Sequence, residues 1–280
     1  MTMKRYIILL LVSITTTGFL GCEQSDPEDV LGRIGDVVYF SGYEWDVKIY
    51  ENTQQGPGPN WFSGHYEDVW VDEKGYLHMR ISNRDGRWWA SEIVGRDNIG
   101  FGTYTWVVQG DLENIPENIV LGLFSWDNNT FQEEANSEVD IEFAKWGDAT
   151  TNKTLHYSVQ PVSFGPVYPE RSFAPETPAG SLIGVSTHSF LWTDSIIEWK
   201  SYTGEGIDPA NQIAEWTFTL DNPARVKNEN GLSSDPVIIP SPGATTNARI
   251  NFWIMPWISP APTDNSEHEI VIRSFTYTPL

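Results

Sequence analysis

The chain has a single cysteine, few basic residues and no long apolar run. Each of these shortages excludes a structural feature or a class of binding partner. Because Cys22 is the only cysteine, no disulfide can form within the chain. Lys and Arg number 17 against 38 Asp and Glu, which gives a formal net charge of −21. Nucleic acids and anionic lipid surfaces bind basic proteins, so this charge argues against both as partners.

The N-terminal segment has the features of an export signal. Two basic residues precede an apolar run from Tyr6 to Val12, which is too short to favour a membrane-spanning helix. A small residue and then Cys22 follow, a pattern that resembles a bacterial lipoprotein signal. We therefore expect a signal peptide at 1–21, a lipidated Cys22 with an acidic tether over 22–36, and one domain at 37–280. The protein would be lipid-anchored in the cell envelope, at the outer membrane; with an ordinary secretory signal and an incidental Cys22 it would be secreted.

Motifs for metals, phosphates and nucleophilic triads are missing from the sequence. His65, His78, His188 and His268 are not spaced as metal ligands, and no phosphate loop or Ser-His-Asp pattern occurs. No amphipathic helical stretch of useful length occurs either. We therefore expect no cofactor and little helix.

Aromatic residues and turn formers are abundant. The chain has 13 Trp, 11 Tyr and 13 Phe, and 23 Gly with 18 Pro separate many short aromatic and β-branched runs. This pattern predicts an all-β antiparallel sandwich. The segments Pro161–Gly180 and Asn222–Thr246 are rich in Pro, Gly and Ser and are predicted to be long loops. The predicted strands are Trp45–Tyr50, Asp68–Asp72, Tyr76–Ser82, Glu92–Val94, Tyr104–Val108, Ile119–Trp126, Glu138–Phe143, Thr154–Gln160, Ser189–Trp192, Ile196–Tyr202, Ile213–Leu220, Arg249–Met255 and Glu269–Thr278.

The most informative stretch is Glu-Val-Asp-Ile-Glu at 138–142. Side chains of a strand alternate between its two faces, so Glu138, Asp140 and Glu142 share one face and the apolar residues between them share the other. Paired carboxylates are what glycoside hydrolysis uses, one as nucleophile and one as proton donor. The alternative is a half-buried strand with a solvated acidic face.

Further stretches accompany this motif in a consistent order. They are Ala90-Ser91-Glu92-Ile93, Gly100-Phe101-Gly102-Thr103-Tyr104, Thr154-Leu155-His156-Tyr157-Ser158-Val159, His188-Ser189-Phe190-Leu191-Trp192 with Ile196-Ile197-Glu198-Trp199, and Asn251-Phe252-Trp253. Together with the acidic motif they resemble glycoside hydrolase family 16, over most of the chain after Gly86.

This resemblance implies a curved jelly roll whose concave face is a polysaccharide cleft. It also implies a retaining endo-mechanism, with Glu138 as nucleophile, Asp140 as auxiliary carboxylate and Glu142 as general acid/base. The substrate would be a polysaccharide or oligosaccharide, and the protein would act as a monomer. Members of the family often hold a structural calcium, which the acidic loops permit, although no residue here locates it.

The spacing of the two glutamates raises a geometric question. Residues four apart on a strand have Cα atoms roughly 13 Å apart, whereas retaining hydrolysis needs carboxyl groups about 5–5.5 Å apart. A concave strand with inward-leaning glutamates would close this gap, and Asp140 could hydrogen-bond one of them. In such a cluster one carboxyl should keep its proton near neutrality while another stays ionised.

The form of the motif indicates the substrate class. A regular Glu-x-Asp-x-Glu strand resembles the lichenases and xyloglucan-active enzymes, while an extra residue before the last glutamate resembles laminarinases, agarases and carrageenases. We therefore expect a β-glucan with mixed or β-1,4 linkages. Ser158, Asn136 and Ala144 depart from the family pattern, which indicates an atypical substrate. A non-catalytic glycan-binding surface lipoprotein of the same fold is the alternative.

Several aromatic side chains are candidates for sugar binding, because sugar rings stack on aromatic faces. Trp253 is the first candidate, followed by Trp126, Trp146 and Trp257. His156 is expected to donate a hydrogen bond near the catalytic glutamates. By contrast, Trp192, Trp199 and Trp216 lie in alternating strands and are expected in the core.

Overall fold

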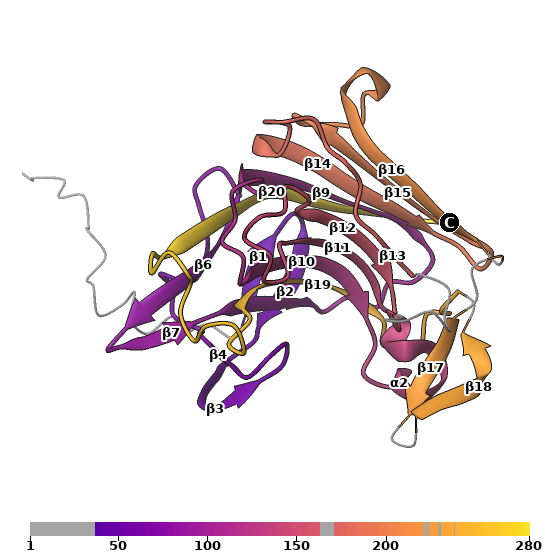
Figure 1. The fold of residues 1–280 in the computed structure, drawn as a ribbon, viewed down its shortest axis with the longest axis horizontal. Coiled ribbons are helices and arrows are strands. Elements are labelled where there is room, and N and C mark those ends of the chain that lie inside the picture. Colours follow the sequence, from indigo (N-terminus) through magenta and orange to yellow (C-terminus); the bar gives the residue numbers. More distant parts are fainter. Residues whose placement is uncertain (1–36, 163–170, 220, 222–223, 229–230, 238) are drawn as a thin grey trace, which may run out of the picture.

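The computed structural model describes residues 37–280 apart from 163–170, 220, 222–223, 229–230 and 238 (Figure 1). The expected signal peptide, Cys22 and tether lie outside the described residues. Two antiparallel sheets stack face to face, which confirms the predicted all-β sandwich. Among the described residues, no helix is both long enough and apolar enough to cross a bilayer.

The first sheet, called sheet A, has eight strands and includes the acidic motif. Its central strands are β19, β10 and β11, and their neighbours extend it to β1 at one edge and β13 at the other. In spatial order the strands are β1 (Val37–Phe40), β2 (Tyr43–Val47), β8 (Ser91–Gly95), β19 (Asn247–Ile254), β10 (Ile119–Trp126), β11 (Val139–Ala144), β12 (Leu155–Val159) and β13 (Ser172–Phe173).

The second sheet, called sheet B, covers one face of sheet A. In spatial order it contains β16 (Gln212–Thr219), β15 (Ile196–Thr203), β14 (Ile183–Trp192), β9 (Gly102–Asp111), β20 (His268–Pro279), β6 (Leu77–Arg84) and β5 (Val69–Val71), and β7 (Arg87–Trp89) pairs with β6. Two ribbons stand apart from both sheets: β3 (Tyr50–Gln55) with β4 (Asn60–Phe62), and β17 (Ala224–Asn228) with β18 (Gly231–Val237). The short helical pieces are α2 (Phe131–Glu134), η1 (Ala135–Ser137) and η2 (Pro209–Asn211).

The core between the sheets follows from the alternation of side chains. In β11, Val139, Ile141 and Phe143 are fully buried against sheet B, so the intervening acids point to the free face of sheet A. Trp192 and Trp199 of sheet B are fully buried as predicted, and Trp216 stacks on Trp199 at 4.8 Å. Burial of each large apolar side chain contributes about 1.5–3 kcal/mol, so the core fixes which face of β11 carries the acids.

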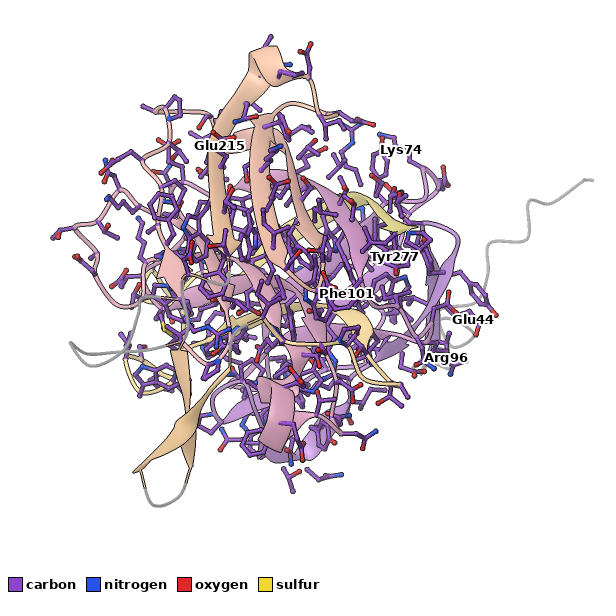
Figure 2. The ribbon with its side chains drawn as sticks, turned by 90° about the vertical axis from the view of Figure 1, so that its right-hand side faces the viewer. Glu44, Lys74, Arg96, Phe101, Glu215 and Tyr277 are labelled. Atoms are coloured by element: carbon purple, nitrogen blue, oxygen red, sulfur yellow. The ribbon has the colours of Figure 1, made fainter. Side chains whose placement is uncertain are left out.

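The surface of the sandwich carries many charged side chains (Figure 2). The labelled pair Arg96 and Glu44 joins the β1–β2 region to the end of β8, with a closest N–O distance of 3.0 Å. Both side chains are exposed, so the pair contributes little to stability.

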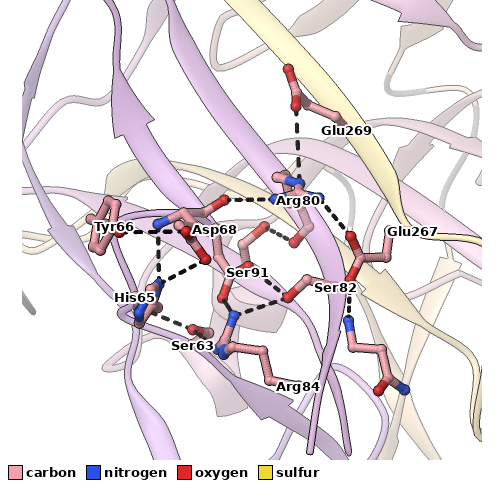
Figure 3. A network of polar contacts seen from close by, with 12 residues as sticks. Ser63, His65, Tyr66, Asp68, Arg80, Ser82, Arg84, Ser91, Glu267 and Glu269 are labelled. Atoms are coloured by element: carbon pink, nitrogen blue, oxygen red, sulfur yellow. Dashed lines mark hydrogen bonds and ion pairs between the residues drawn. The ribbon is translucent and has the colours of Figure 1, made fainter. Parts of the chain in front are cut away.

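A polar network ties the two sheets together near β8 (Figure 3). Arg84 and Ser82 of β6 both bind the buried carboxylate of Asp68, Ser82 at 2.6 Å. The Ser91 hydroxyl of β8 donates to the Arg80 carbonyl of β6 at 3.1 Å, across the two sheets. This bond fixes the position of Ser91 in β8, and Glu92 is the next residue of that strand.

Most predicted strands occur, but β14 begins at Ile183 and not at the predicted Ser189, and β1, β4 and β7 were not predicted. The prediction of a long loop over 222–246 is wrong, because β17 and β18 pair within it. A two-stranded ribbon outside the sandwich is held by its own ladder, so it needs no apolar row that sequence patterns would reveal. The predicted strand Trp45–Tyr50 is divided, because β2 ends at Val47 and β3 begins at Tyr50. In the described part of Pro161–Gly180, only the two residues of β13 are in a strand.

Candidate active site

The three acids of the motif meet at one pocket on the free face of sheet A. Asp140 and Glu142 belong to β11, and Glu138 lies directly before it. The pairing of β11 with both neighbours runs without a register shift, so the strand is regular, as its sequence predicts. The pocket has a volume of about 290 Å³ and is lined by Lys48, Gly56, Pro57, Glu92, Gly122, Phe124, Trp126, Glu138, Asp140, Glu142, Arg249, Asn251 and Trp253.

A row of directly paired residues crosses sheet A at the level of Glu142. It runs from Glu92 of β8 through Asn251 of β19, Gly122 of β10 and Glu142 of β11 to His156 of β12. A Cβ atom at Gly122 would lie 2.5 Å from Asn251 Oδ1, so only glycine leaves this part of the floor open. Asn251 Oδ1 is buried without a hydrogen-bond partner among the described residues, and Asn251 lines the pocket.

The surrounding protein favours the protonated form of all three acids. Burial raises the pKa of Glu142 well above its usual range, and the charge of Asp140 raises it further. Burial also raises the pKa of Glu138, and the charge of Glu142 raises it further. Burial and then the charge of Glu138 raise the pKa of Asp140.

Interactions that lower the pKa act on Glu138 and on Asp140. None of those found among the described residues acts on Glu142. The positive charge of Arg249 and a hydrogen bond from protonated Asp140 both lower the pKa of Glu138. Gln160 Nε2 donates to Asp140 Oδ2 at 3.2 Å. Nothing in the described part of the chain lowers the pKa of Glu142. Interactions that favour the ionised form therefore act on Glu138 and Asp140, and none of those found for the described residues acts on Glu142.

Sequence reasoning did not identify a second charged group in the pocket, formed by Lys48, Glu92 and Arg249. Lys48 Nζ lies 2.7 Å from Glu92 Oε2 and also donates to the Gly56 carbonyl. Arg249 Nη1 lies 3.7 Å from Glu92 Oε1, and its guanidinium lies 5.3 Å from the Trp126 ring centre. The available signal was strand alternation: Glu92 lies between buried Ser91 and Ile93, and Arg249 shares a face with Asn251 and Trp253.

The structure brings two of the five candidates, counting His156, to this pocket. Trp126 and Trp253 line it, although Trp253 is only 6% exposed and packs on Phe62 and Val120. Trp146, Trp257 and His156 are not among the lining residues. Trp146 is 43% exposed and its ring centre lies 5.9 Å from that of His156.

The position of His156 differs from the sequence expectation. Its Nε2 lies 3.0 Å from the Ala144 carbonyl oxygen, so its hydrogen bond goes to the backbone and not to a glutamate. Burial lowers the pKa of His156, which favours the neutral ring. His156 nevertheless lies directly opposite Glu142 in the pairing of β11 with β12. It is the last residue, on the β12 side, of the row that begins at Glu92.

The backbone that leads into Glu138 has an uncommon conformation. Ala135, Asn136 and Ser137 have φ of 47°, 63° and 52°, in the left-handed region that non-glycine residues rarely adopt. Each such residue costs roughly 1–2 kcal/mol unless its surroundings hold it. Asn136, one of the departures from the family pattern, is buried, and its Nδ2 donates to the Asp127 carbonyl at 3.0 Å.

The structural calcium that the resemblance permits has no identified site among the described residues. Among the described residues, no group of three or more His, Cys, Asp or Glu side chains is placed to hold a metal ion.

Comparisons with known proteins give a fold and no family. No protein-family model matches the chain. A human protein, tyrosine-protein phosphatase non-receptor type 7, is 31% identical over 120 residues, which is 42% of this chain. The match spans about a third of that relative's length, 32%, which is too little to indicate shared function.

Solved structures match over nearly the whole chain. The β-glucanase of Bacillus licheniformis has a TM-score of 0.57 at 15% identity, covering 87% of this chain and 95% of that one. The laminarinase of Flavobacterium sp. UMI-01 also has a TM-score of 0.57, at 11% identity with 83% and 92% covered. A Mycobacterium tuberculosis protein described as a pseudo β-1,3-glucanase has a TM-score of 0.54, at 14% identity with 83% and 89% covered. This chain therefore has the jelly-roll sandwich fold of these proteins.

Proposed function

We propose that the protein is a retaining endo-glycosidase that hydrolyses a β-linked polysaccharide, a β-glucan with mixed or β-1,4 linkages. One observation carries the proposal: three acids line a single pocket, and interactions that favour ionisation act on Glu138 and not on Glu142. Retaining hydrolysis needs this division between an ionised nucleophile and a protonated acid. The glucanases that share the fold add support.

In the proposed reaction each acid has one task. Glu138 attacks the anomeric carbon while Glu142 donates its proton to the leaving oxygen, so the glycosidic bond breaks as the glycosyl-enzyme ester forms. Glu142 then removes a proton from water, which attacks the anomeric carbon and releases Glu138. Asp140 donates a hydrogen bond to Glu138, which stabilises the ionised nucleophile before attack and as leaving group.

Isosteric substitutions test the catalytic assignment. Glu138→Gln and Glu142→Gln should each lower kcat by about 100- to 10,000-fold, and Asp140→Asn should lower it less. Glu198→Gln, on β15 of sheet B, is the matched control and should keep wild-type activity. Azide should restore turnover of Glu138→Ala and give the inverted glycosyl azide. Near-wild-type activity of either glutamine variant would refute the assignment.

The linkage preference rests on the regular pairing of β11, because the resemblance connects a strand without a bulge to β-1,4-containing glucans. Initial rates on barley β-glucan, xyloglucan, laminarin and agarose at equal mass concentration test it. Hydrolysis of barley β-glucan or xyloglucan should be fastest. If laminarin or agarose were cleaved faster than both, the linkage proposal would fail while the catalytic assignment would stand.

A glycan-binding protein without catalysis is the second candidate. The Mycobacterium tuberculosis neighbour, described as a pseudo β-1,3-glucanase, favours it because that protein has this fold. Three acids whose pKa values are all raised by burial and mutual repulsion are a poor binding surface for neutral sugars, which disfavours it. Release of reducing ends from any of the four polysaccharides decides between the two candidates.

A further inference from the structure

The hydroxyl of Ser125 bridges the backbone on both sides of Glu138. Ser125 Oγ accepts a hydrogen bond from the Val139 amide at 3.0 Å and donates to the Ser137 carbonyl at 2.8 Å. Ser125 is fully buried near the end of β10. The pairing of β10 with β11 ends at Phe124 and Asp140, so the hydroxyl continues the contact where the backbone ladder stops.

The need for such a bridge comes from the backbone before Glu138. Ala135, Asn136 and Ser137 are left-handed in succession, and non-glycine residues relax from that region unless they are held. Ser137 Oγ donates to the Ser241 carbonyl at 2.6 Å, which holds one side of the turn. The Asp127 amide donates to the Asn136 carbonyl at 2.6 Å, which holds the other. From the β12 side the Gln160 amide donates to the Glu138 carbonyl at 3.1 Å, and the Ser125 bridge is the contact that joins the last residue of the turn to Val139.

We propose that Ser125 is a positioning residue, which holds the Glu138 carboxylate where it can attack the anomeric carbon. The inference rests on the proposed function. Retaining chemistry needs the two carboxyl groups about 5–5.5 Å apart, and a misplacement of about 1 Å can lower a rate by about 100-fold. Relaxation of the turn would rotate the Glu138 side chain while Glu142, farther along β11, stayed in place.

If Ser125 had a structural role alone, its substitution would lower stability without a separate loss of kcat. Thr187 provides a matched control for such a role. Thr187 of β14 is also fully buried, and its hydroxyl makes the same two kinds of bond. Thr187 Oγ1 donates to the Gly204 carbonyl at 2.8 Å and accepts from the Gly206 amide at 2.9 Å. Thr187 lies in sheet B, away from the pocket, so loss of its bonds should affect stability only.

The experiment compares Ser125→Ala, Ser125→Cys and Thr187→Val in thermal unfolding, kcat, KM and the pH dependence of kcat/KM on the best polysaccharide. Ser125→Ala should lower kcat by about 10- to 100-fold with KM nearly unchanged. Its acid limb should move to higher pH, because a displaced Glu138 loses the hydrogen bond from Asp140. Thr187→Val should lose similar thermal stability while keeping kcat and the pH profile of wild type.

Ser125→Cys guards against a variant that does not fold, since a thiol keeps the volume and makes weaker hydrogen bonds. It should have an intermediate kcat. Wild-type kcat in either folded Ser125 variant, with Glu138→Gln inactive, would overturn the positioning role and leave the proposed function intact. If wild type cleaved no polysaccharide, the proposed function itself would fail, which is a distinct result.

Discussion

Individual charges around the pocket act on the ionisation of Glu138. Arg249 is the cation that acts on Glu138, and its guanidinium lies over the Trp126 ring. A guanidinium keeps its charge across the working pH range, so its effect on a neighbouring carboxylate does not depend on its own titration. Glu138 therefore has a permanent cation on one side and the hydrogen bond from Asp140 on another.

Arg249→Met should move the acid limb of the kcat/KM profile to higher pH. Removal of the positive charge raises the pKa of Glu138, so a larger share of the enzyme has a protonated, inactive nucleophile at acid pH. The measurement is kcat/KM between about pH 4 and 8 on the best substrate. Arg87→Met is the control, because Arg87 also lies over a tryptophan, 4.2 Å from the Trp61 ring centre, and does not line the catalytic pocket.

An unchanged acid limb in Arg249→Met would show that burial and neighbouring acids alone set the ionisation of Glu138. An equal displacement in Arg87→Met would point to a general effect of net charge.

At the scale of single residues, the sequence predicts the acids better than their partners. Alternation alone places Asp140 and Glu142 opposite the buried Ile141, and the structure has them so. Lys48, Glu92 and Arg249 meet because β2, β8 and β19 are neighbours in sheet A, an order that local patterns do not contain. His156 illustrates the same limit, since its strand position was predictable and its backbone partner was not.

Strand β11 is held from beneath by the opposite sheet. Trp199 of β15 is fully buried, and its Nε1 donates to the Asp140 carbonyl at 2.9 Å. The bond fixes the distance between the Asp140 backbone and sheet B. Asp140 also pairs with Ser158 in the β11–β12 ladder, so the indole adds a bond from the opposite sheet.

Trp199→Phe should lower both stability and kcat. The substitution removes one hydrogen bond to the Asp140 carbonyl, which should cost about 0.5–1.5 kcal/mol in the free energy of unfolding, measured in urea. The matched control is Trp192→Phe, because Trp192 is equally buried and its Nε1 donates to the Pro240 carbonyl at 2.9 Å. Both variants should lose similar stability, and only Trp199→Phe should lose kcat. Equal kcat in the two variants would mean that β11 does not depend on this bond.

The sequence predicts elements well where burial imposes a pattern. The strands of both sheets that face the core have apolar rows, and most were predicted close to their bounds. The β17–β18 ribbon pairs with neither of the two large sheets, and its Pro, Gly and Ser content indicated a loop. The left-handed turn before Glu138 could not be predicted, because Ala135 and Ser137 are not residues that favour that conformation.

The whole molecule carries a formal net charge of −21, so its own surface has no attraction for anionic membranes. We propose that a lipid on Cys22 holds it at the cell envelope. Wild type should fractionate with membranes and incorporate a fatty-acid analogue, and Cys22→Ala should be soluble and unlabelled. Wild type that took up no label would contradict the lipid anchor and leave the secreted form.

A buried histidine should make the sandwich sensitive to acid. His188 lies under β11, with Nδ1 2.8 Å from Ser201 Oγ and Nε2 2.7 Å from Ser186 Oγ. Burial lowers the pKa of His188 from 6.5 to about 3. The unfolded chain therefore binds this proton below about pH 6.5 while the folded chain does not, and the stability is lost as the pH falls toward 3.

The three acids of the pocket should act in the opposite direction. Their pKa values are raised in the folded state, so folding favours proton uptake and their burial destabilises the protein less as the pH falls. The free energy of unfolding of wild type, His188→Gln and Asp140→Asn, measured in urea from pH 7 to pH 4, separates the two effects. Relative to His188→Gln, wild type should lose up to about 1.4 kcal/mol per pH unit below 6.5. Relative to Asp140→Asn, it should gain stability over the same range, and gaps that stayed constant with pH would show that neither group is titrated on unfolding.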